Sequence, residues 1–86
     1  MKTKEKALSV IVASTDKVLW SGIALSVSSV NSDGPFDLLG GHANFITLIE
    51  NKPIEVVTVD KKTMTFTFKQ AIIFIVSNLV KIYAEE

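Results

Sequence analysis

The feature that most constrains the fold of this chain is the strict alternation of apolar and polar side chains over residues 63–68. Met64, Phe66 and Phe68 alternate there with three threonines. A period of two places successive side chains on opposite faces, so the segment predicts a half-buried β-strand. Nowhere in the 86 residues do apolar side chains recur with the 3.6-residue spacing of a helix. The chain is therefore expected to be all-β.

Turn-forming residues divide the rest of the chain into further short segments rich in Val, Ile, Thr and Phe, which favour strands. Gly22, inside the longest segment, predicts a bulge or a bend. The predicted strands span residues 8–12, 18–30, 36–39, 45–49, 54–59, 63–68, 72–76 and 79–83. Such a series predicts a flattened β-sandwich or barrel of about eight to ten short, mainly antiparallel strands. Residues 1–86 are expected to form one domain.

Composition excludes several function classes. The net charge is zero and all nine basic residues are lysine, whereas nucleic-acid binding favours a basic excess with arginine, so no nucleic-acid partner is expected. Cysteine is absent and His42 is the only histidine, so we expect no metal site and no cofactor. A neutral, apolar-rich chain is poorly protected against association, and weak self-association of the isolated chain is expected.

The hydrophobic runs are also too short for a membrane span, because the longest reach about six residues where roughly 20 are needed. The amino-terminal segment lacks a signal-peptide core. We expect the charged residues at the two ends of the chain to be solvated, and these are Lys2, Lys4, Lys6, Glu85 and Glu86. The expected location is the cytosol, or the cytosolic side of a membrane complex.

His42 is the one side chain suited to acid–base work near neutral pH. It follows two glycines in a predicted loop, and Asp37 is the nearest acid in sequence. No nucleophile motif accompanies it, so we interpret His42 as a loop residue that forms a hydrogen bond or contacts a partner. No catalytic residue is predicted. Trp20 is either an exposed anchor or a core residue, and the core is favoured.

Residues 71–76 are apolar at every position. A strand of a two-layer sandwich turns one face to the core and the other to water, and its sequence should alternate. Two explanations fit: a chain terminus folds over the outer face, or that face docks another subunit. We favour docking, through Ile72, Phe74 and Val76.

Three stretches of the chain resemble one known family. Residues 17–22 (KVLWSG) are similar to a KVLFEG-type second hairpin. Residues 33–49 (DGPFDLLGGHANFITLI) resemble the pattern G-E-F-G-I-L-P-x-H-A-P-L-I-T-x-L, and the last hairpin resembles F-L-E-V-x-D-N-x-V-T-V-L-A-D-E. Together they resemble the N-terminal β-sandwich domain of the ε subunit of F-type ATP synthases, called δ in mitochondria, over about residues 8–86.

The resemblance implies a ten-stranded sandwich at the foot of a rotating stalk. One face would bind the γ subunit, and one end would rest on the membrane c-ring, which couples ion translocation to ATP synthesis. The implied γ face contains Ile72, Phe74 and Val76. The implied c-ring end contains Asp33, Gly34, Asp37, Gly41 and His42. The subunit would be non-catalytic and peripheral, at the cytoplasmic face of the membrane and attached only through the complex.

The chain departs from the family pattern in two ways. Family members usually add an inhibitory C-terminal helical hairpin where this sequence stops, at Glu86, so no inhibitory or nucleotide-binding role is expected. Several motif positions also differ, and they are Pro35, Asp37, Gly40, Asn44, Gln70, Ala71 and Phe74. The alternative hypothesis is a stand-alone β-sandwich module on the same scaffold that binds a different protein.

Overall fold

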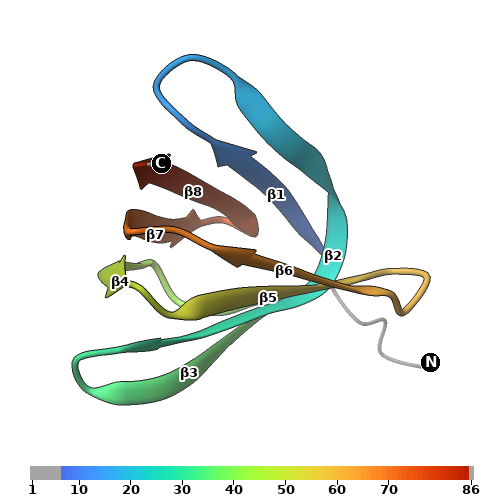
Figure 1. Ribbon diagram of the computed structural model, residues 1–86. Helices are drawn as coiled ribbons and strands as arrows, with labels where there is room; N and C mark the ends of the chain where they lie inside the picture. Colours follow the sequence, from blue (N-terminus) through green and yellow to red (C-terminus); the bar gives the residue numbers. More distant parts are fainter. Residues whose placement is uncertain (1–6, 86) are drawn as a thin grey trace, which may run out of the picture.

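The computed structural model describes residues 7–85, and their regular structure is entirely β-strand (Figure 1). Of the residues expected as solvated ends, Lys2, Lys4, Lys6 and Glu86 lie outside that range, and Glu85 is exposed, as predicted. The strands are β1 (Leu8–Ala13), β2 (Val18–Asn31), β3 (Gly34–Leu39), β4 (Phe45–Glu50), β5 (Pro53–Thr58), β6 (Thr63–Thr67), β7 (Gln70–Val76) and β8 (Leu79–Glu85). Each predicted strand coincides with one of them to within two residues at either end. The all-β prediction is confirmed.

The strands form one curled sheet in the order β4-β7-β8-β1-β2-β5-β6, and β3 pairs with β2. The 14-residue strand β2 belongs to both halves of this sheet, because its first half pairs with β1 and its second half pairs with β3 and β5. Figure 1 shows β2 curving from one layer into the other. All pairs are antiparallel except β1 with β8, which is parallel.

The core lies between the two layers and consists of aliphatic side chains from alternate strand positions. The largest fully buried ones are Leu8, Val10, Val12, Val27, Leu38, Ile49, Ile54, Val56, Ile73, Ile75, Val80 and Ile82. The pattern of β6 behaves as predicted: Met64 and Phe66 pack against this core, and the three threonines point to solvent. Phe68 follows β6 and stacks on Phe66 with 6.1 Å between ring centroids.

Of the two features predicted at Gly22, a bulge or a bend, the bulge is not found. Gly22 pairs with Val10 in regular register, and the irregular steps of β2 fall elsewhere, opposite Val12 and Ala13 and between Ala24 and Ser26. The glycine is needed for space, because a Cβ at this position would stand 2.7 Å from Cζ2 of the Trp20 ring. Trp20 itself is partly buried and packs against the core, which agrees with the favoured interpretation of this residue.

Candidate protein-docking surfaces

The outward face of β7 is apolar and open to solvent. Ile72 is 43% exposed and Val76 is 46% exposed, and Phe74 between them is half-buried. The inward residues are Ala71, Ile73 and Ile75, all of them buried. Within residues 7–85 no terminus folds over this outer side. The first of the two explanations for the apolar strand is therefore not found in the described chain.

The strands on both sides of β7 extend this apolar surface. Ile46 of β4 is opposite Phe74, and Leu48 is opposite Ile72. On the other side, Tyr83 of β8 is opposite Ile72, and its ring lies 6.0 Å from that of Phe74. We define the outer apolar face by its residues: Ile11, Ile23, Ile46, Leu48, Ile72, Phe74, Val76, Leu79 and Tyr83.

Sequence reasoning missed the residues that β4 and β8 contribute, including Ile46, which is 69% exposed. A signal was present, since residues 45–49 are as apolar on both faces as residues 71–76, apart from one threonine. A strand with two apolar faces needs cover on both sides. The alignment of β4 beside β7 then places two such strands next to each other and widens the surface.

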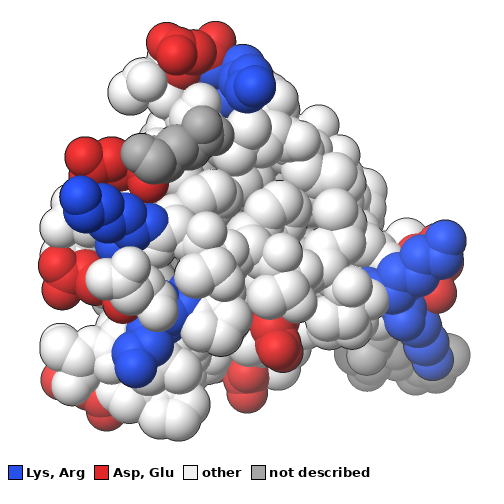
Figure 2. All heavy atoms as spheres, viewed as in Figure 1, with Lys and Arg blue, Asp and Glu red and all other residues white. Residues whose placement is uncertain are grey.

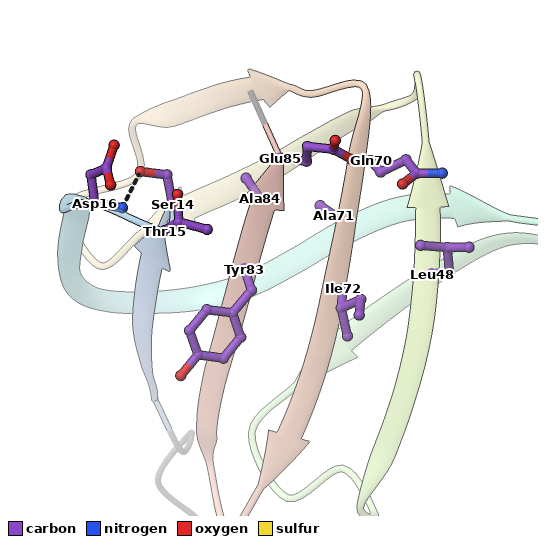
Figure 3. A pocket seen from close by; sticks show the side chains of 10 residues that line it. All are labelled: Ser14, Thr15, Asp16, Leu48, Gln70, Ala71, Ile72, Tyr83, Ala84 and Glu85. Atoms are coloured by element: carbon purple, nitrogen blue, oxygen red, sulfur yellow. Dashed lines mark hydrogen bonds between the residues drawn. The ribbon is translucent and has the colours of Figure 1, made fainter.

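An open pocket of about 940 Å³ lies at one end of this face (Figure 3). Leu48, Ile72 and Tyr83 line its apolar part, and Gln70 and Glu85 lie at the ends of their strands. Its remaining wall is the turn at residues 14–16, in which Ser14 Oγ accepts a hydrogen bond of 3.4 Å from the Asp16 amide. The Ser14 hydroxyl therefore helps to form a turn, and the lining contains no imidazole to act as its base.

Charged side chains sit mainly at turns and strand ends. In Figure 2 they gather around the rim of the molecule, and a broad uncharged area fills the middle of that view, over β1, β2 and β6. Lysines and acids alternate along much of this rim. A nucleic-acid interface needs a field of one sign, and this view of the molecule offers none.

The loop between β3 and β4 places Gly41 and His42 beside the β7–β8 turn. The Gly41 amide donates a 2.8 Å hydrogen bond to the side-chain oxygen of Asn78 in that turn. Gly41 has a φ of +86°, which favours glycine. The exposed His42 ring packs edge-on against Phe45, and its Nδ1 lies 2.8 Å from the Ala43 carbonyl oxygen. The loop is thus held by hydrogen bonds on both sides of its tip.

The other residues predicted for the c-ring end lie elsewhere. Asp33 and Gly34 form the turn between β2 and β3, where Gly34 has a φ of +116°. Asp37 lies within β3 and accepts a 2.6 Å hydrogen bond from the Ser28 hydroxyl. The turn and the His42 loop are separated by the whole six-residue strand β3, or roughly 17–20 Å. The structure therefore does not bring the five residues together at one point.

The sequence matches the family model described as the β-sandwich domain of the ATP synthase delta/epsilon chain, over residues 7–86. The chain belongs to this family. No curated protein matches its sequence. The ε-type resemblance of the three motifs is thereby confirmed at the level of the family. The all-β fold that it implied is found as well, with eight strands in residues 7–85 where the resemblance implied ten.

Solved structures of ATP synthases contain chains with the same fold. One chain of the *Euglena gracilis* mitochondrial ATP synthase structure that contains OSCP, F1 and the c-ring superposes with a TM-score of 0.85 at 13% identity. The superposition covers 93% of this δ/ε-family chain and 51% of the *Euglena* chain, so this chain spans about half the length of that one. A chain of the *Tetrahymena thermophila* mitochondrial central stalk and c-ring superposes with a TM-score of 0.76 at 10% identity, covering 98% of this chain and 67% of that one.

At such identities the likeness shows the fold, and the contacts of this δ/ε-family chain remain predictions. Ile72, Phe74 and Val76 lie together on the outer apolar face, as the predicted γ face requires of them. Among residues 7–85 there is no cluster of three or more possible metal ligands. Nor does that part of the chain contain a helix with the length and hydropathy needed to span a bilayer.

Proposed function

We propose that this chain is a non-catalytic subunit of the central stalk of an F-type ATP synthase. It binds the γ subunit through the outer apolar face and reaches the c-ring through its loops, and so helps to couple ion translocation to ATP synthesis. The observation that carries the proposal is the outer apolar face itself, which no segment of residues 7–85 covers in this member of the δ/ε family. Its place at the membrane, on the cytoplasmic face, is through the complex alone.

The shape of this face suits a contact that must transmit torque. Five adjacent strands contribute to it, β4, β7, β8, β1 and β2, and their backbones are hydrogen-bonded to one another in that order. A sheet of this kind resists shear better than a loop does, and a broad contact spreads the load over many side chains. Exposed aromatic and branched aliphatic residues are also the usual centre of an interface.

For the c-ring we propose two separate contacts. The β3–β4 loop offers His42 and Gly41, and the β2–β3 turn offers Asp33 and Gly34, with Asp37 on the strand that joins them. Both are connections between strands at the surface, where binding residues are most often found. His42 is exposed and its ring is oriented by Phe45, which suits a contact residue.

The test is binding of the purified γ subunit by the isolated chain and by the variant Phe74→Glu. Phe74 lies in the middle of the outer apolar face, so a charge there should weaken γ binding by about 30-fold or more, as loss of an interface hot spot does. The variant should stay folded, because Phe74 is only half-buried. Titration calorimetry measures the affinity and circular dichroism checks the fold.

The control is Val59→Glu, which places the same charge on an apolar residue at the β5–β6 turn that is 52% exposed, and this variant should bind γ like the unaltered chain. If Phe74→Glu unfolds the domain, Phe74 is a core residue and the docking assignment is wrong. If the unaltered chain does not bind γ, the alternative of a stand-alone module for another protein takes precedence.

A further inference from the structure

One charged side chain lies inside the outer apolar face. Lys81, in the middle of β8, points to the same side as Leu79 and Tyr83. Its partners in register are Phe74 on β7 and Ile11 on β1. The ammonium group therefore extends from a position with apolar neighbours on both adjacent strands.

No acid of the described chain neutralises Lys81. The one ion pair within residues 7–85 joins Lys62 and Asp60, in the β5–β6 turn. The acid closest to Lys81 on the same face of β8 is Glu85, four positions further along the strand and so about 13 Å away. In the isolated chain water hydrates the ammonium while the aliphatic stem covers apolar surface.

A partner that covers this face removes that water. An ammonium group buried without a counter-charge is strongly unfavourable, so the covering surface must supply an acceptor, and a carboxylate is the best one. A second copy of this chain fits poorly, because a two-fold contact centred here would place two Lys81 side chains against each other. Charge complementarity thus favours a different protein over self-association.

We propose that Lys81 is the charge anchor of this docking face, and that the surface bound there is apolar with an aspartate or glutamate opposite Lys81. The inference rests on the proposed function, in which that surface belongs to the γ subunit. It adds the chemistry by which the partner is recognised. The pair fixes the register of the contact, which the surrounding aliphatic side chains specify weakly.

The experiment uses a zero-length carbodiimide cross-linker on the complex of this chain with γ. The reagent joins an amine to a carboxylate only where the two are in contact, with loss of one water. Mass spectrometry should find a cross-linked peptide pair that contains Lys81 and one acidic residue of γ. Lys81→Arg should bind with nearly native affinity and lose this cross-link, because a guanidinium pairs with a carboxylate but does not react.

Affinity gives a second readout. Lys81→Met keeps the length and loses the charge, so it leaves the γ carboxylate buried and unpaired and should weaken binding by at least about 30-fold. Lys62→Met, in the distant β5–β6 turn, is the control and should leave the affinity for γ unchanged. Two results together overturn this inference alone: the complex with γ forms without a cross-link at Lys81, and Lys81→Met binds γ as tightly as the unaltered chain. Absence of any complex with γ overturns the proposed function as well.

Discussion

Space around single side chains limits what the sheet tolerates, and Gly22 is a position without room for a side chain. A methyl group there would stand 2.7 Å from Trp20 Cζ2 and 2.9 Å from Cη2. We therefore predict that Gly22→Ala lowers the free energy of unfolding by about 1–3 kcal/mol, because the indole must leave its place on the core. Urea denaturation followed by tryptophan fluorescence measures the loss.

The control for this prediction is a double-mutant cycle with Trp20→Phe. Phenylalanine lacks the outer ring atoms that would clash, so Gly22→Ala should cost clearly less in the Trp20→Phe background than in the unaltered chain. Strictly additive losses would show that the glycine is required for some reason other than the indole.

Among the turns and strands, the β5–β6 turn contains a carboxyl group with a shifted pKa, that of Asp60. The Thr58 hydroxyl donates a hydrogen bond to Asp60, and this bond, helped by the nearby Lys62 ammonium, holds the pKa of Asp60 below its usual 3.8. Since the pKa is lower in the folded chain, the carboxylate stabilises the folded state above pH 3.8, and this contribution is lost as the pH falls through the folded-state value.

Thr58→Val should therefore raise the pKa of Asp60 towards its ordinary value, and it should weaken the dependence of turn stability on acid pH. NMR titration of the Asp60 carboxyl carbon measures the shift. Thr65→Val, on the exposed side of β6, removes a hydroxyl far from the carboxylate and serves as the control. An unchanged pKa of Asp60 in Thr58→Val would assign the lowering to the backbone amide hydrogen bond of Asp60 and to the Lys62 ammonium instead.

The sequence predicts a feature well when neighbouring residues determine it, and poorly when pairing between distant strands does. Alternation located the strands, because inward and outward residues differ in polarity, as in β6. The extent of the docking face needed the β4–β7 pairing, which no local pattern encodes, so Ile46 and Leu48 were missed. The family resemblance assigns the c-ring residues to one end of the domain, but the extended strand β3 separates Asp33 from His42.

For the molecule as a whole, one hydrogen bond helps to close the curled sheet. The Asn31 amide, at the end of β2, donates a 2.9 Å hydrogen bond to the Thr47 hydroxyl of β4, an edge strand that is separated from β2 by three strands in the order of the sheet. We predict that Thr47→Val costs about 1 kcal/mol of stability, since the partly buried amide loses its acceptor. Chemical denaturation measures this cost.

Hydrogen exchange distinguishes closure from a merely local effect. If the bond closes the sheet, Thr47→Val should speed amide exchange in β4 and at the end of β2 together. Thr67→Val, an exposed threonine of β6, should leave both protected. Faster exchange in β4 alone would contradict the closing role.

The parallel pairing of β1 with β8 determines when this domain is able to fold during synthesis. β1 is made first, yet one of its edges stays open until Leu79–Glu85 has left the ribosome, and Val10 meets its neighbour Val80 only then. Such distant pairing is slow to form compared with local hairpins. The docking face includes Leu79 and Tyr83 of the same late strand, so a nascent chain cannot present a finished binding surface before its own core is closed.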